Sequence, residues 1–273
     1  MKSRFEWTCA LMTAGVLVAP TSQAQEVGTR AVSSTSFDLG LTSRNIDTAD
    51  STSNGTVDFF GVLTAPIGNV LGVSLDVGYA KSRVRTSDVL GSGETDTTSP
   101  KGARSSCTFK GTNADATLFA RRPTLGKLSV SYGIADRSSD CGESSVFTFT
   151  GDDSLNSNHY RFAGEAYLGN FTIGASRTST DLEDGPKLET NEVSASWYAM
   201  DNLRVTAYGN DLYDDNTYGL QIEHQPEFMG NDLGIWLGFS QTDGTPRTRI
   251  ISVGVQYHFG RNATLKVRDR ELR

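Results

Sequence analysis

Between Thr35 and Phe259, the chain repeats segments of about ten residues in which apolar side chains alternate with small or polar ones. The last segment is the clearest. Its apolar positions are Ile251, Val253, Val255, Tyr257 and Phe259. The residues between them are small or polar, and successive side chains of a β-strand point to opposite faces. The pattern therefore predicts strands with one apolar and one polar face.

The alternating pattern occurs twelve times along the chain. The segments are 35–43, 56–65, 70–80, 112–122, 127–136, 159–168, 171–179, 190–200, 203–211, 217–225, 232–241 and 248–259. An even number of strands suits the closure of an up-and-down sheet into a barrel. In the segment 56–65 the two faces are about equally polar, which leaves the direction of Asp58 open.

The connections between these segments are sorted by length. The short ones are 66–69, 123–126, 169–170 and 201–202, and they carry turn residues. The long ones are polar and include 45–55, 81–111, 137–158 and 180–189. A soluble sandwich has no reason to sort its connections in this way. A barrel through an outer membrane does, because its turns are short on the periplasmic side and its loops are long outside.

Aromatic residues lie near both ends of the predicted apolar faces. Those toward the outer ends are Tyr79, Tyr160, Phe162, Tyr218 and Phe239, and those toward the inner ends are Phe37, Phe171, Tyr257 and Phe259. Two aromatic belts are typical of a barrel that crosses a lipid bilayer, because aromatic rings favour the interface between lipid and water. The pattern thus favours an all-β, transmembrane, antiparallel barrel over a soluble sheet.

The N-terminus has the features of a secretory signal peptide. Lys2 and Arg4 precede an apolar stretch over 7–19, and small residues follow at 22–24. We expect cleavage after Ala24, so that residues 1–24 are removed. A membrane anchor is disfavoured because the apolar stretch is too short to cross a hydrocarbon core of about 30 Å.

Composition excludes several other classes of protein. Only 37% of the 273 residues are hydrophobic, and the formal net charge is −7. Outside the signal peptide, no apolar run is long enough for a transmembrane helix. The excess of acidic residues also disfavours binding to nucleic acid.

The signal peptide, the amphipathic strands, the sorted connections and the final Tyr257-His258-Phe259 resemble a Gram-negative outer-membrane β-barrel of the porin type. The resemblance covers 35–259 and is to the class only. It implies that Tyr257 and Phe259 belong to a C-terminal signal read by the barrel assembly machinery. We interpret residues 25–34 as a periplasmic N-terminal segment and 260–273 as a charged periplasmic tail. The tail departs from the usual pattern, and a further strand there is the alternative.

The less apolar face of the predicted barrel carries ten charged residues. The acids are Asp38, Asp58, Asp76, Asp115, Glu165, Glu192 and Glu223, and the bases are Arg121, Arg161 and Arg204. This excess of acids predicts a water-filled passage that favours cations or neutral solutes, because charged rings set the sign preference of pores. In the alternative, Arg161 pairs with Glu165 and Arg204 with Glu192, and the resulting network plugs a narrow barrel.

Two cysteines remain after removal of the signal peptide. Cys107 and Cys141 lie in long connections on the same predicted side, so we expect a disulfide between them, with two free thiols as the alternative. Acidic clusters also occur in these connections, at 152–153, 181–184 and 211–215. None has the spacing of a calcium loop, so we interpret them as solvated surface and expect no metal site.

The chain lacks the motifs of an enzyme. Its three histidines are predicted to lie apart, and none belongs to a nucleophile motif. We therefore expect an outer-membrane channel, without cofactor, for the passive diffusion of small hydrophilic solutes. The alternative is a non-conducting barrel that contacts lipopolysaccharide or external partners through its acidic loops. The sequence leaves open the solute and whether the barrel is monomeric or forms a homo-oligomer.

Overall fold

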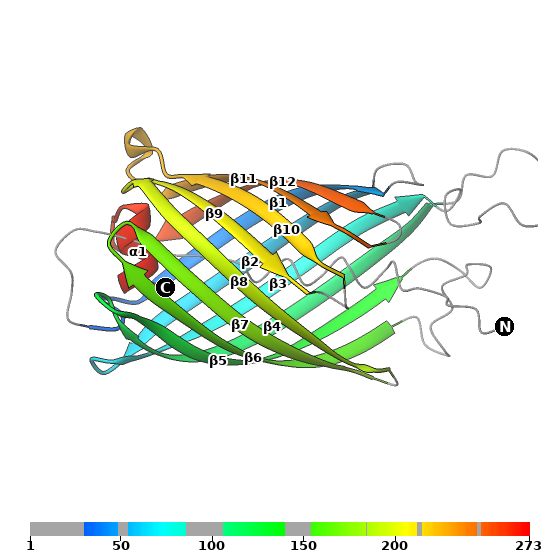
Figure 1. Cartoon of the computed structure of the whole chain (residues 1–273), viewed down its shortest axis with the longest axis horizontal. Coiled ribbons are helices and arrows are strands. Elements are labelled where there is room, and N and C mark those ends of the chain that lie inside the picture. The colour runs from blue at the N-terminus through cyan, green and yellow to red at the C-terminus, as the bar shows by residue number, and fades with distance from the viewer. Residues whose placement is uncertain are drawn as a thin grey trace, which may run out of the picture.

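The computed structural model describes residues 30–48, 54–85, 106–139, 154–183, 185–211, 215–244 and 247–273. These residues form twelve strands, one 3-10 helix and one short α-helix. The strands form a closed barrel in which each one is antiparallel to its neighbours in chain order (Figure 1). The strands are β1 (Ser36–Thr48), β2 (Asn54–Ile67), β3 (Leu71–Arg85), β4 (Ser106–Arg122), β5 (Gly126–Ser139), β6 (Ser154–Leu168), β7 (Phe171–Leu182), β8 (Lys187–Met200), β9 (Leu203–Asn210), β10 (Thr217–His224), β11 (Leu233–Thr242) and β12 (Thr248–Phe259). The helices are η5 (Glu227–Met229) and α1 (Leu265–Glu271).

The predicted twelve-stranded, up-and-down barrel is confirmed. Predicted and observed strands agree closely at one end of the barrel, where the connections over 68–70, 123–125, 169–170 and 201–202 are short. We call this the turn end and the opposite one the loop end. Toward the loop end, several strands extend further than expected: β4 begins at Ser106 and β3 continues to Arg85, both inside the predicted loop 81–111.

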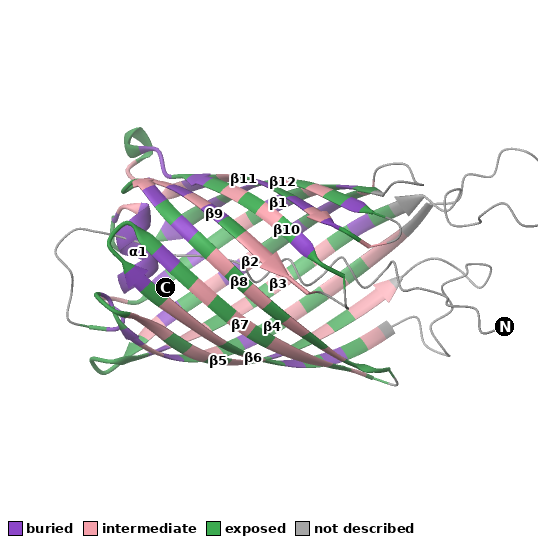
Figure 2. Ribbon diagram, viewed as in Figure 1, coloured by how far each residue is buried: buried purple, intermediate pink, exposed green. Residues whose placement is uncertain are grey.

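The two faces of the sheet have opposite chemistry. Large apolar side chains point outward and remain exposed on the isolated chain, as with Val77 at 57% and Leu237 at 55%. Inward-facing positions are mostly polar and buried or half-buried, which gives the alternating bands along the strands in Figure 2. An apolar surface that encircles a barrel is far larger than the patches that monomeric proteins expose to water. Hydrocarbon is the environment that this surface fits.

The seam between β1 and β12 closes the barrel. Their register runs from Phe37 opposite Phe259 to Thr48 opposite Thr248. On the outer face of this seam, the Phe37 and Phe259 rings stack at a centroid distance of 5.6 Å. Tyr257 packs edge-on against Phe259 at 4.7 Å. Closure pairs the edge strands, which an open sheet could not do within a bilayer.

Glycines enable two of the short turns. Gly68 and Gly169 have φ values of +72° and +61°. This left-handed conformation is strained for residues with a Cβ. The polypeptide can therefore reverse direction within two or three residues at the turn end. Most residues of the connections at the loop end lie outside the described part of the chain, so the expected loop lengths stay predictions.

Residues 260–273 are arranged differently from the expected tail. They contain α1, which is a helix and not a further strand, and which lies within the turn end of the barrel (Figure 1). Every residue of α1 is buried, although five of its seven residues are charged. In the described part of the chain, no helix is long and apolar enough to cross a membrane. The N-terminal residues Ala31 and Val32 are also fully buried, and the Ala31 amide donates to the Asn69 carbonyl at 2.7 Å.

We predict that an arginine is tolerated in the lumen but not on the outer face. Leu220 and Gln221 are neighbours near the middle of β10 and point to opposite faces. Leu220→Arg should lower the free energy of unfolding by about 2–4 kcal/mol in lipid vesicles, because it places a charge in hydrocarbon. Gln221→Arg should have less than half that effect. Denaturant titration of both variants measures the difference, and equal destabilisation would contradict the assignment of the two faces.

Candidate functional site

The inside of the barrel contains a cavity of about 270 Å³. Strands from all sides contribute to it, and most of the lining residues are polar or charged. The cavity includes Arg273 near the turn end, and Thr217 and Thr242 near the loop end. It is therefore a hydrophilic space within an apolar wall, and it is the candidate site of this chain.

The structure places every predicted lumen residue on the inward face. Those that line the cavity are Asp76, Asp115, Arg161, Glu165, Glu192 and Glu223, together with Asp58, whose direction the sequence left open. Asp38, Arg121 and Arg204 also point inward but lie at the turn end, where each is 1% exposed. The three are covered by the last residues of the chain.

Ion pairs link different strands inside the lumen. Arg44 of β1 pairs with Asp58 of β2 at 2.9 Å, and Arg161 of β6 lies 3.6 Å from Glu192 of β8. The alternative of a plugged lumen pairs Arg204 with Glu192, but in the structure Arg204 pairs with Glu223 of β10. Its position in the register explains this, because Arg204 lies opposite Glu223 at the turn end of β9.

Two histidines form close pairs with aspartates inside the barrel. His159 Nε2 lies 2.5 Å from Asp115 Oδ1, and His258 Nδ1 lies 2.6 Å from Asp38 Oδ1. The third histidine, His224, is exposed and contacts the Asn202 carbonyl at the turn end. The histidines are thus separated, as expected.

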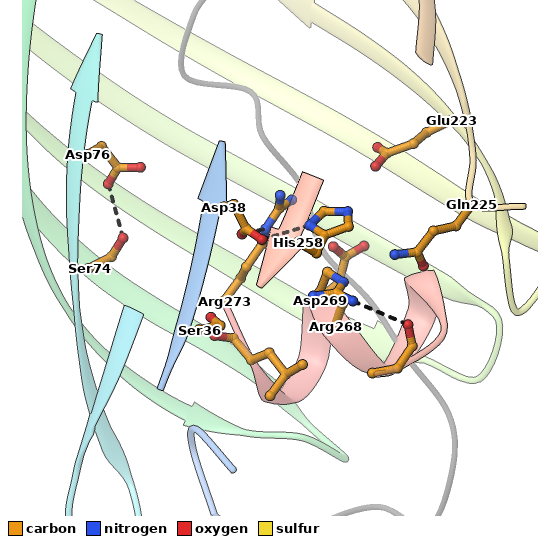
Figure 3. A network of polar contacts seen from close by, with 12 residues as sticks. Ser36, Asp38, Ser74, Asp76, Glu223, Gln225, His258, Arg268, Asp269 and Arg273 are labelled. Atoms are coloured by element: carbon orange, nitrogen blue, oxygen red, sulfur yellow. Dashed lines mark hydrogen bonds and ion pairs between the residues drawn. The ribbon is translucent and has the colours of Figure 1, made fainter. Parts of the chain in front are cut away.

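A polar cluster joins α1 to the barrel wall, and Figure 3 shows its members Asp38, Asp269 and Arg273. We call it the latch cluster, and it consists of Asp38, Arg121, Arg204, Asp269 and Arg273. Asp269 of α1 accepts from Arg204 at 3.0 Å, and Arg273 donates to Asp38 at 2.7 Å. Arg121 donates to the carbonyls of Asp269, at 2.9 Å, and of Arg273. The wall therefore binds both side chains and backbone of the terminal segment.

Further contacts complete the binding of α1. Tyr198 donates to Asp269 at 2.9 Å. This tyrosine points inward because it continues the alternation of β8 from Glu192, and a register irregularity between Tyr198 and Met200 then turns Met200 outward. Lys266 donates to the Asn170 side chain at 2.5 Å, and Arg270 donates to the Phe171 carbonyl at 3.0 Å. The helix is thus bound to several strands and turns around the mouth.

Arg268 and Arg273 of the terminal segment remain charged at neutral pH. Burial lowers the pKa of Arg268 to about 10, with the carboxylate of Asp38 acting in the opposite direction. Burial also acts to lower the pKa of Arg273, but the neighbouring carboxylates of Asp38 and Glu223 raise it above its usual value. The latch cluster is consequently held by charge-assisted hydrogen bonds, which are stronger than neutral ones.

Three large rings lie against glycines of neighbouring strands. The cross-strand pairs are Phe60 with Gly40, Tyr208 with Gly219, and Trp236 with Gly254. A Cβ at any of these glycines would overlap the ring opposite. Absence of that atom lets each aromatic side chain lie along the wall, and all three rings line the cavity. Glycine therefore provides the space that these inward-facing rings occupy.

The balance of charge in the cavity is less acidic than the sequence suggested. Six carboxylates line it against four basic side chains, a formal balance of −2 when histidine is neutral. Sequence reasoning missed three of those bases, Arg44, Lys127 and Arg273. Arg44 lies just beyond the predicted end of the first strand, and Arg273 belongs to the expected tail. Lys127 could have been found from the sequence, because it shares the polar face of its strand with Ser129 and Ser131.

Some expectations fall outside the described residues. These include the signal peptide 1–24 and Cys141, so the disulfide with Cys107 stays a prediction. Of the acidic clusters, 152–153 is also outside. Asp211 lies beside β9, and hydrogen bonds from the Asn191 side chain and backbone lower its carboxyl pKa. Within the described ranges, no group of three or more His, Cys, Asp or Glu side chains is placed to hold a metal ion.

Comparison with solved structures shows that this chain is similar in fold to several known barrels. No protein-family model matches the chain, and no curated protein matches it. The β-domain of the Bordetella autotransporter BrkA has a TM-score of 0.52 at 10% identity, covering 82% of this chain and 99% of that one. The translocator domain of autotransporter NalP from Neisseria meningitidis has a TM-score of 0.50 at 12% identity, covering 82% and 88%. The KdgM porin in complex with disordered oligogalacturonate has a TM-score of 0.49 at 10% identity, covering 81% and 99%.

The similarity to the two autotransporter domains agrees with the closed sheet. The chain has the fold of outer-membrane β-barrels, as the resemblance in its sequence implied. At such low identity the similarity concerns the fold, and the function has to be argued from the lumen.

We predict that the glycine beneath Trp236 is required for stability. Gly254→Val should lower the free energy of unfolding by about 1–3 kcal/mol, because the new side chain overlaps the indole and forces repacking. Gly55→Val is the matched control, since a Cβ at Gly55 meets nothing within 4 Å. Unfolding in detergent measures both. The double variant Gly254→Val/Trp236→Ala should recover part of the loss, and failure of this rescue would contradict the proposed overlap.

Proposed function

We propose that the chain is an outer-membrane, porin-like channel for the passive diffusion of small hydrophilic solutes. The observation that carries this proposal is the polar cavity within a closed sheet whose outer face is apolar. Such a wall separates a hydrophilic path from hydrocarbon, which is what a passive channel requires. No catalytic step is part of the proposal.

The lining favours a mild preference for cations and neutral solutes. Six carboxylates face four basic groups, so the excess of negative charge is small. Asp76 and Asp115 are direct neighbours on β3 and β4. Lys127 of β5 also lines the cavity and counteracts their field. Charged groups that line a narrow pore set its sign preference, so these residues are proposed to act in selectivity.

The orientation and assembly of the barrel are part of the same proposal. The signal peptide 1–24 would deliver the chain across the inner membrane, with residues 25–34 and the turn end in the periplasm. Tyr257 and Phe259 are exposed on the outer face at the seam, a position open to recognition by the barrel assembly machinery. The aromatic residues of the two predicted belts are also exposed, which suits contact with lipid and lipopolysaccharide.

A non-conducting structural or adhesion barrel is the second candidate function. The latch cluster favours it, because α1 is buried within the mouth of the barrel at the turn end. In this case the lumen would have no transport role, and the acidic loops would contact lipopolysaccharide or external partners. Conductance measurements separate the two candidates.

We predict that charge changes in the cavity alter ion selectivity in opposite directions. The native protein in a planar bilayer should prefer cations in a salt gradient. Asp76→Asn should lower the ratio of cation to anion permeability by about twofold, and Lys127→Gln should raise it by about as much, because each changes the charge of the lining. Reversal potentials measure the ratio.

Asp243→Asn is the control for this experiment, since Asp243 is exposed just beyond β11 and does not line the cavity. Its permeability ratio should equal that of the native protein. Anion preference in the native protein would contradict the proposed selectivity but not the proposed channel. The channel would be contradicted if neither the native chain nor Asp269→Arg, a change that should displace α1, gave current steps.

A further inference from the structure

We propose that the terminal segment 260–273 is a displaceable plug that gates the barrel, with Arg121 and Arg204 as the wall residues that hold it closed. This inference rests on the proposed channel function and adds a regulation to it. The segment lies at the turn end of the cavity, and Arg273 forms part of the cavity lining (Figure 3). Solutes that pass through the turn end must therefore displace it.

The closure is built from both ends of the described chain. Arg121 donates to the carbonyl of Ala31 at 2.6 Å and to the carbonyl of Asp269 at 2.9 Å. The Ser33 amide donates to the Glu271 carbonyl at 2.7 Å. One wall arginine thus joins the N-terminal segment to α1 across the mouth. These contacts across the mouth are lost when α1 leaves it.

The contacts that hold the plug are mostly polar. Asp269, Arg270 and Arg273 bind wall groups, and their partners belong to different strands. The buried apolar cluster in this region consists of Ala263, Val267 and Leu272, which all belong to the terminal segment itself. When the plug leaves, its charge-assisted hydrogen bonds to the wall are exchanged for bonds to water, which offsets most of their gross strength. Release of the plug would expose these polar groups of the wall together with the rings of Tyr167 and Tyr198, against which Arg270 lies.

The connection to the barrel permits such a movement. Residues 261–264 between β12 and α1 have no regular secondary structure. Gly260 follows β12 directly with a φ of +117°, a conformation that side chains with a Cβ rarely adopt. The plug is thus tethered through a short irregular segment that begins at a glycine. Displacement requires no change in the pairing of β12 with its neighbours.

The charge of the plug determines how a voltage acts on it. Residues 260–273 contain five basic and two acidic side chains, a formal charge of +3. A potential that is negative on the turn side draws this segment out of the mouth, and the opposite potential presses it inward. Gating should therefore be asymmetric in voltage, with longer openings when the turn side is negative.

The first test measures release of the plug by thiol labelling. Val267, which is 1% exposed, is changed to cysteine in a chain with Cys107→Ser and Cys141→Ser. A maleimide coupled to dextran, too large for the lumen, is added to the protein in lipid vesicles. Labelling should be slow, and it should become at least tenfold faster when Asp269→Arg is added, because that change places two arginines against each other. Circular dichroism and heat-dependent gel migration establish that both barrels are folded.

The second test measures current through the same proteins in a planar bilayer. The native chain should be closed for most of the time, whereas Asp269→Arg should stay open longer and lose its voltage asymmetry. The chamber from which the maleimide reacts identifies the turn side. Asp243→Arg is the matched control. It makes the same change of charge at an exposed residue of the loop end, and it should behave as the native protein does.

The outcomes distinguish the plug from the channel. Equal labelling rates and identical currents in the native and Asp269→Arg proteins would overturn the plug and leave the channel in place. Faster labelling without current from either protein would support the displaceable plug and overturn the channel. Faster labelling together with longer openings supports both.

Discussion

The structure depends on a single closed sheet having hydrocarbon on one side and water on the other. In hydrocarbon, each backbone amide and carbonyl needs a partner within the protein, and a closed barrel provides one for every strand. The seam between β1 and β12 is therefore as important as any other pairing. The period of two follows from the same constraint, because alternate side chains meet the two environments.

This constraint explains why so much of the fold could be predicted. All twelve strands and the inward direction of residues such as Asp76 and Glu192 follow from alternation alone. The prediction failed near the loop end, where β3 and β4 extend to Arg85 and Ser106. There the outward positions carry charged residues, Lys81, Arg83 and Lys110, so the apolar alternation of the rest of the sheet is lost. Arg44 was missed for a related reason, because it lies past the last clear alternation of β1.

The plug could not be predicted by the same reasoning. A short helix with charged residues on all sides usually indicates a solvated segment, because charges are rarely buried in a protein core. Inside this barrel the surroundings are polar, so Asp269 and Arg273 find partners of opposite charge in Arg204 and Asp38. Those partners are far from α1 in the sequence, and only the closed fold brings them together. The charge balance of the lumen changed accordingly, since the sequence had placed Arg273 outside it.

The measurement that tests this account most directly is the environment of successive residues along β8 in lipid vesicles. Val193 and Ala195 point outward, whereas Thr190 and Ser194 point into the barrel. A fluorophore is attached to a single cysteine at each position, and the quencher that acts on it should change with the face on which the position lies. A quencher bound to lipid should act at Val193 and Ala195, and an aqueous quencher at Thr190 and Ser194. Quenching without alternation, or access of the aqueous quencher to Val193 and Ala195, would contradict the account.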